Sequence, residues 1–143
     1  MGNFIYDRQP ELIEWASKVI DMVPRDDVHA LGWEEDGKIR AVTLYDTFSE
    51  CDCFMHMASD GPRTWLKRAF LFTAFAHPFI QWKKRRVTVP VPSKNTDSLR
   101  FVRHLGFEQE GIIRHATKDD DIILLGMLRE NCRFIPETFR RVS

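Results

Sequence analysis

Residues 95–114 read NTDSLRFVRHLGFEQEGIIR, and this stretch decides the fold. Asn is a preferred N-cap residue, so Asn95 predicts the start of a helix that covers residues 97–104. Gly106 supplies the left-handed conformation in which many helices end. The residues from Phe107 to Ala116 then predict a strand. A helix that leads at once into a strand indicates a domain in which both kinds of element share one core.

Two neighbouring segments extend this unit. Residues 122–129 predict a second strand, which pairs with the first in a hairpin around Lys118-Asp119-Asp120. Upstream, Arg86–Val91 (RVTVPV) predicts a buried strand, although Pro90 cannot donate to its ladder. The proline indicates an edge, a bulge or a strand splayed away from its neighbour. A splayed strand leaves free backbone groups with which an extended ligand can pair, whereas the alternative is an ordinary edge strand that tolerates a proline.

The first half of the chain shows helical and strand periodicities in turn. The predicted elements are a helix over residues 9–22, a hairpin of Ala30–Glu35 with Lys38–Thr47 around Asp36-Gly37, a strand over residues 51–59, and a helix from the Ser59–Pro62 loop to about Ala76. We expect Asp7 to cap the first helix and Pro24 to end it, and Pro78 to disrupt the other. The order α β β β α β α β β predicts one mixed α/β domain over residues 1–143.

The strand–loop–helix segment over residues 51–76 suggests an anion site. A helix N-terminus presents unpaired backbone N–H groups and the positive end of its dipole, which together can bind a pyrophosphate. Gly61 lets the chain approach a ligand closely, and Arg63 adds positive charge. Many strand-to-helix loops contain a glycine and a cap, so this feature alone is not specific.

The three motifs Asn95-x-x-Ser98, Leu105-Gly106-Phe107 and Glu110-Gly111-x-x-Arg114 closely resemble, in this spacing, the C-terminal half of the GNAT (GCN-five-related) N-acetyltransferases. The nearest match is the subgroup that acetylates ribosomal-protein N-termini and small-molecule amines. The resemblance implies an α/β fold with a mixed, mostly antiparallel central sheet flanked by helices. It also implies that strands splayed near Pro90 form the acyl-CoA cleft. The implied activity is acetyl-CoA-dependent transfer of an acetyl group directly to a primary amine.

The family pattern, carried over residue by residue, implies a set of cofactor contacts. These are Met57, Ser59, Gly61, Arg63, Thr64, Asn95 and Ser98. The pyrophosphate loop of the family is Arg/Gln-x-x-Gly-x-Gly/Ala, and here residues 59–66 depart from it, with Trp65 where a small residue is usual. Many members place a Tyr seven residues after the Asn to protonate the leaving thiolate. That position is Val102, so the resemblance makes Ser98 the candidate donor.

Direct transfer also needs a group that removes a proton from the amine. We expect His56 in this role, because its unperturbed pKa suits neutral pH, with Glu35 as a second candidate. The other nearby candidates are Glu34, Glu50 and Asp52. A histidine inside an apolar strand is more often a satisfied core residue, which is the alternative for His56. Cys53 could in principle carry an acyl group, but no base is paired with it at a defined spacing.

Composition restricts the partners. Lys plus Arg and Asp plus Glu each number 21, and this balance disfavours nucleic acid as the partner without excluding it. Cys51, Cys53 and Cys132 show no metal-site spacing, so no metal is expected. The absence of a signal peptide and of a long apolar run predicts a cytoplasmic protein, a monomer or homodimer, with no membrane partner. The acceptor, a small molecule or a protein, stays open. The rival function is a GNAT-fold module that binds acyl-CoA or a protein with little or no turnover.

Overall fold

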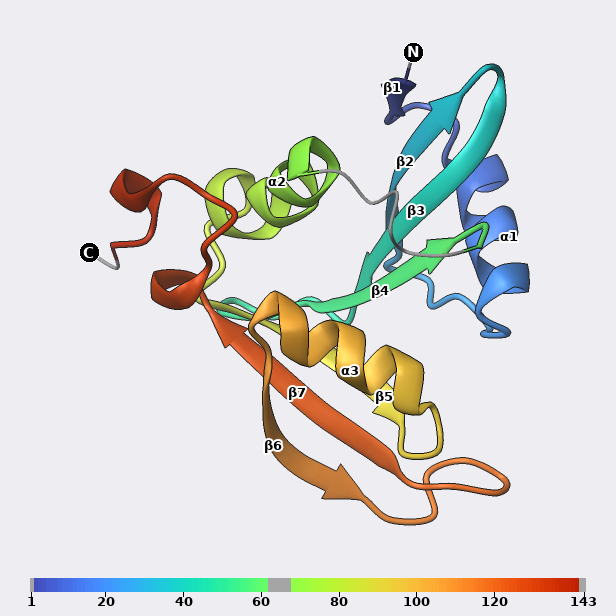
Figure 1. The fold of residues 1–143 in the computed structure, drawn as a ribbon, viewed down its shortest axis with the longest axis vertical. Helices are drawn as coiled ribbons and strands as arrows, with labels where there is room; N and C mark the ends of the chain where they lie inside the picture. Colours follow the sequence, from blue (N-terminus) through green and yellow to red (C-terminus); the bar gives the residue numbers. More distant parts are fainter. Residues whose placement is uncertain (1, 62–67, 142–143) are drawn as a thin grey trace.

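The structure, a computed structural model, describes residues 2–61 and 68–141. Seven strands form one open sheet in the order β1-β2-β3-β4-β5-β7-β6 (Figure 1). The elements are β1 (Gly2–Ile5), α1 (Gln9–Val19), β2 (His29–Glu35), β3 (Lys38–Asp46), β4 (Phe54–Ser59), α2 (Arg68–Ala76), β5 (Arg86–Pro92), α3 (Thr96–Leu105), β6 (Glu108–Ile113) and β7 (Ile122–Leu128). All neighbouring strands are antiparallel except β4 and β5. The predicted mixed, mostly antiparallel sheet flanked by helices is therefore confirmed.

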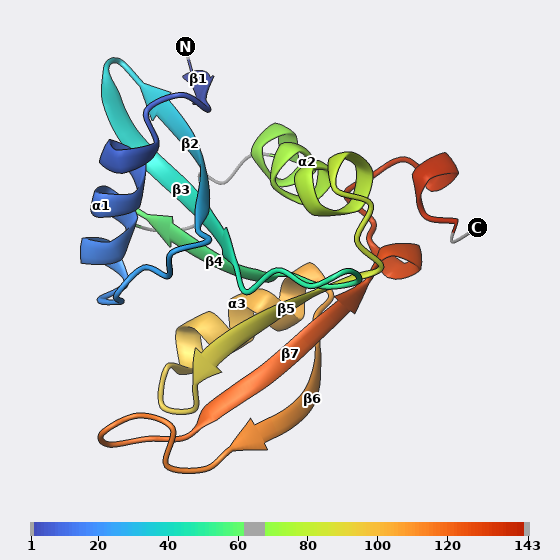
Figure 2. The same cartoon turned by 180° about the vertical axis from the view of Figure 1, so that it is seen from behind.

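The helices cover the two faces of the sheet unequally (Figures 1 and 2). On one face, Leu12 and Ala16 of α1 pack with Val42, Leu44 and Ala58 of β3 and β4. Helices α2 and α3 lie on the other face and share one hydrophobic cluster with residues of β3, β4, β5 and β7. Both helices belong to crossovers that move the same way across the sheet, and the right-handed rule places them on the same side. On its own face, α1 packs against β2, β3 and β4.

The N-terminal segment differs from the sequence prediction in two ways. Gly2–Ile5 form an extra edge strand that pairs with residues 32–35 of β2, which four residues with no clear alternation did not signal. Helix α1 ends at Val19 rather than Met22, and its N-cap is Arg8 without a side-chain cap bond, not Asp7. Pro10 lies in the first turn as expected.

Local turn chemistry placed the hairpin and α3 correctly. Asp36 and Gly37 both have positive φ, 52° and 77°, as the two-residue turn of a twisted hairpin requires. The Asn95 side chain accepts a hydrogen bond from the Ser98 N–H, and Gly106 ends α3 with a φ of 115°. We expected Pro78 to disrupt the helix. In the structure the α-helical geometry ends at Ala76, and the chain continues as a π-helical turn over His77–Gln81. Among the described residues no helix combines the length and the apolar character needed to cross a membrane.

Candidate active site

The sheet divides between β4 and β5. These parallel strands share a single register pair, Phe54 with Thr88, and beyond it they diverge (Figures 1 and 2). We call the unpaired part, Met55–Ser59 of β4 and Val89–Pro92 of β5, the fork. On its outer side β5 stays fully paired with β7, from Arg86 with Leu128 to Pro92 with Ile122. Pro90 therefore marks a splayed strand inside the sheet, one of the three predicted possibilities.

Backbone parity explains why prolines are tolerated in β5. The amide N–H groups of Arg86 and Thr88 donate to Cys51 and Cys53, so every second residue of β5 faces β4. Pro90 and Pro92 continue this series. Both lack an N–H on the side where the strands have already parted, so neither proline breaks a ladder bond. Their carbonyl groups are acceptors directed into the fork.

The same parity applies to β4. Cys53 accepts its bond from Thr88, so Met55 and Met57 direct their backbone N–H and C=O groups toward β5. The Phe54–Thr88 pair uses the N–H of Met55, and beyond it β5 no longer pairs with the Met55 carbonyl or with Met57. An extended ligand with amide groups could bond to these positions as an added strand. Met57, a predicted cofactor contact, lies in this row.

His56 lies on the fork strand between these two methionines. It pairs in register with Leu44, so its side chain is on the face covered by α1. Its Nε2 lies 3.0 Å from Oδ2 of Asp46, whose side chain is only 1% exposed, while that of His56 is 15% exposed. A buried carboxylate needs a partner of this kind, and the bond fixes the orientation of the imidazole. The sequence reasoning missed Asp46; its signal is an acidic residue that continues the buried run of β3.

Backbone strain occurs directly beside this pair. Thr47 has a φ of 54°, which is rare for a β-branched residue. Its hydroxyl donates to Oδ1 of Asp46 at 2.9 Å, so both oxygens of the carboxylate are bonded. Strain of this kind persists where the surroundings hold a residue in place, and it is concentrated at functional sites.

The open end of the fork carries the other predicted cofactor residues. Ser59 ends β4, and its hydroxyl donates to the carbonyl of Gly61, which has a φ of 120°. Asp60 is held by Arg40 through both its backbone N–H and its carboxylate. Asn95 follows β5 at the same end, because β4 and β5 are parallel. Arg63, Thr64 and Trp65 lie outside the described residues.

The Asn95 cap can be tested by itself. Asn95→Ala removes the acceptor for the Ser98 N–H, and we expect it to lower the free energy of unfolding by about 1 kcal/mol. Asn95→Asp keeps an acceptor at this position and should leave the stability near that of the wild type. Chemical denaturation of the three proteins measures the free energy of unfolding. An equal decrease in both variants would show that the side-chain acceptor at position 95 does not stabilise the helix.

Ser98 and Val102 follow Asn95 along α3. Ser98 lies in the first turn, half-buried, with its N–H bonded to the Asn95 side chain. Val102 is a core residue that packs in the cluster beneath α2 and α3. The position at which many relatives place a Tyr is therefore filled by hydrophobic packing, and Ser98 remains the predicted donor.

The remaining candidate bases lie elsewhere. Glu34 is paired with Arg8 at 3.0 Å, and Glu35 with Arg40 at 3.5 Å. Both lie on β2, which β3 separates from the fork strand β4. Asp52 is bound to Thr88 and Arg86 before β4 begins. The structure thus brings His56, Met57, Ser59, Gly61, Asn95 and Ser98 to the two fork strands and their open end, and does not bring Glu35 there.

Cys53 is completely buried at the closed end of the fork. Burial, with the nearby Asp52 carboxylate as a smaller cause, raises the pKa of its thiol to about 12. A thiol in this state is a poor nucleophile at neutral pH. In residues 2–61 and 68–141, no three His, Cys, Asp or Glu side chains gather as metal ligands would.

Solved structures share this architecture. The spermidine/spermine N-acetyltransferase SpeG from Vibrio cholerae superposes with a TM-score of 0.73 over 90% of this chain and 95% of its own, at 9% identity. A protein from Desulfovibrio desulfuricans described as a GNAT-family acetyltransferase gives 0.71 over 90% and 99%, at 16% identity. This chain has the GNAT acetyltransferase fold.

The GNAT fold is recognised through structure rather than sequence. No family model matches the chain, and no curated protein matches it. A third solved protein, described as an acetyltransferase, has a TM-score of 0.65 at 16% identity. The match includes 75% of this chain and 60% of the length of that protein. At such identities the comparison establishes the shared fold alone.

Proposed function

We propose that this protein is an acetyl-CoA-dependent N-acetyltransferase that passes the acetyl group directly to a primary amine. The observation that carries the proposal is the hydrogen-bonded His56–Asp46 pair on the fork strand. A histidine oriented by a buried carboxylate is suited to accept a proton at neutral pH. Turnover requires a proton acceptor, which a module that only bound acyl-CoA does not require.

The donor substrate would bind along the fork. The backbone groups of Met55 and Met57, directed toward the unpaired side, are suited to the amide groups of an extended pantetheine arm. Ser59 and Gly61 begin the loop that would meet the pyrophosphate, with Arg63 and Thr64 as further contacts.

Three groups of this chain would then assist the transfer: one accepts the proton of the amine, one stabilises the charge on the thioester oxygen, and one protonates the departing sulfur. His56 takes a proton from the amine as its nitrogen attacks the thioester carbon. The N–H of Met57 stabilises the negative charge on the thioester oxygen. Ser98 donates to the sulfur as the carbon–sulfur bond breaks and coenzyme A leaves.

The acceptor is proposed at the level of a class. The amine would approach from the face of the sheet that carries His56, whose side chain keeps 15% of its surface exposed beside α1. The two acceptor types to test are polyamines, on which SpeG acts according to its description, and peptide N-termini, which the subgroup resemblance implies. A cytoplasmic location and a monomeric or homodimeric state belong to the same proposal.

Acetyl-CoA binding and turnover test the proposal. Ligand at about 100 times its dissociation constant should raise the free energy of unfolding by about 2.7 kcal/mol, seen as a higher melting temperature. Thiol release is then followed with spermidine, a lysine peptide and N-terminal peptides. Stabilisation without thiol release from any acceptor would favour the binding module, and the lack of any stabilisation would refute both acyl-CoA functions.

A further inference from the structure

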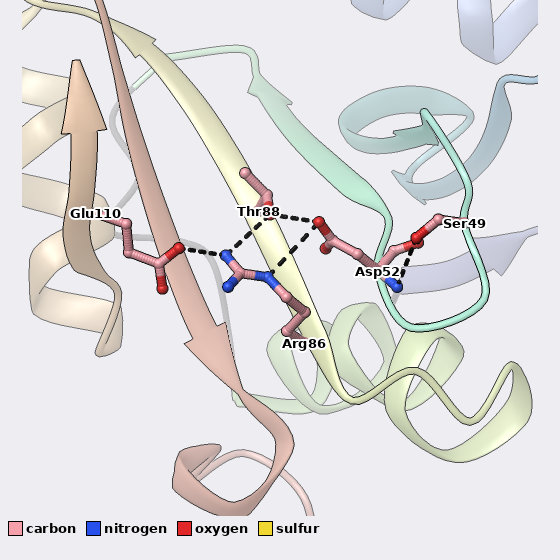
Figure 3. A network of polar contacts seen from close by, with 5 residues as sticks. All are labelled: Ser49, Asp52, Arg86, Thr88 and Glu110. Atoms are coloured by element: carbon pink, nitrogen blue, oxygen red, sulfur yellow. Dashed lines mark hydrogen bonds and ion pairs between the residues drawn. The ribbon is translucent and has the colours of Figure 1, made fainter.

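A polar network crosses the sheet at the closed end of the fork (Figure 3). Arg86 on β5 binds Glu110 of β6 through Nη2 at 2.5 Å, and its Nε lies 3.6 Å from Oδ2 of Asp52. Thr88 joins both partners, since its hydroxyl donates to Asp52 at 2.8 Å and accepts from Arg86 at 3.1 Å. The Asp52 N–H donates to the Ser49 hydroxyl at 3.2 Å. The network therefore links the segment before β4 to β5 and β6.

Strand β7 lies between β5 and β6, and its sequence makes room for the network. Gly126 is the β7 residue paired with Thr88. A Cβ atom on Gly126 would lie 2.3 Å from Oε2 of Glu110 and 2.4 Å from Nη2 of Arg86. Both distances are shorter than van der Waals contact, so any side chain at position 126 would displace the Arg86 and Glu110 side chains. A glycine within a buried strand is thus explained by the pair that passes over it.

The network lies where β4 and β5 last touch. Thr88 is the β5 member of the single register pair with β4, and its N–H donates to the Cys53 carbonyl at 2.9 Å. From this point toward Pro92 the two strands have no further pairing. The angle of the fork therefore depends on how firmly its closed end is held.

The network lies on the same face of the sheet as α1, at the strands β5, β7 and β6. On this face the α1 cluster is formed with β2, β3 and β4, while α2 and α3 pack on the opposite face. Asp52 and Arg86 are mostly buried and Glu110 is partly exposed. Burial raises the pKa of Asp52, while the hydrogen bond from Thr88 and the positive charge of Arg86 act in the opposite direction. The Asp52–Arg86 contact is thus less screened by solvent than a fully exposed surface pair.

We propose that the Asp52–Thr88–Arg86–Glu110 network is a brace that sets the spacing of β4 and β5 at the closed end of the fork, and so positions acetyl-CoA. The consequence for acetyl-CoA rests on the proposed function. The brace itself is a property of the free protein. Its members are positioning residues, because they act through the backbone of the two fork strands rather than on the reacting atoms.

Two variants weaken the brace without removing a charge. Gly126→Ala displaces the Arg86–Glu110 pair, and Thr88→Val removes the hydroxyl that joins Asp52 to Arg86. Val42→Ala, in the α1 cluster away from the brace, is the matched control for a general loss of stability. We expect both brace variants to raise the KM for acetyl-CoA by about tenfold, with the acceptor KM unchanged. Val42→Ala should lower the melting temperature and leave both KM values as they are.

Amide hydrogen exchange of the free proteins gives a second readout that needs no acetyl-CoA. The Thr88 amide, bonded to Cys53, should exchange faster in Gly126→Ala than in Val42→Ala at equal loss of global stability. An unchanged acetyl-CoA KM in both brace variants would overturn the positioning role, and an unchanged Thr88 exchange rate would overturn the brace. If the wild-type protein does not use acetyl-CoA, the proposed function fails, while the exchange rates still decide the brace.

Discussion

His56→Ala is expected to lower kcat by about 10²- to 10⁴-fold, the usual contribution of a positioned general base. The imidazole lies on the fork strand and is oriented by Asp46 at 3.0 Å, so the substitution removes the proposed proton acceptor. Binding of acetyl-CoA should be unchanged, because the proposed contacts with the pantetheine arm come from backbone groups. Steady-state kinetics and calorimetric titration with acetyl-CoA measure the two effects separately.

Two further variants make the histidine experiment specific. His104→Ala removes an exposed imidazole at the end of α3 and should leave kcat unchanged. Asp46→Asn keeps the shape of the orienting residue but removes its charge, and we expect a smaller fall in kcat than for His56→Ala. If His56→Ala turned over at the wild-type rate, His56 would be a core residue and the base would have to be sought elsewhere.

Phe75→Ala is expected to lower the free energy of unfolding by about 3–5 kcal/mol, the range for a fully buried Phe. Phe75 is 0% exposed, and its ring lies 5.1 Å from that of Phe134 and 6.0 Å from that of Phe107. These rings join α2 to the β6 side of the sheet and the C-terminal segment. The loss is a large part of the 5–15 kcal/mol that stabilises an ordinary domain.

Phe72 on the same helix is the matched control. Its side chain is 40% exposed, and Phe72→Ala should change stability by only about 0.5 kcal/mol. Urea unfolding of both variants compares the two sides of α2. Equal losses would mean that the helix presents a different face to the core.

The sequence predicted those parts of the site whose causes are local. Asn95, Gly106 and the Asp36-Gly37 turn act within a few residues of themselves, and all three have the predicted roles. Pro90 indicated an interruption, but three structures could explain it. Only the pairing of β5 with β7 on one side, and its loss of β4 on the other, selected the splayed strand.

The sequence by itself determined the element order from α1 onward, the Asp36-Gly37 turn, the α3 caps and the position of His56 in a strand, because each depends on short-range periodicity and turn chemistry. It did not determine β1. Only the tertiary structure decided which side chains of different strands lie in contact. Asp46 meets His56 through the register of β3 and β4, and Gly126 passes beneath Arg86 and Glu110 through that of β5, β6 and β7. The physical reason is that strand register is a long-range property. A shift of one residue turns every side chain to the other face, and nothing within a single strand specifies its partner.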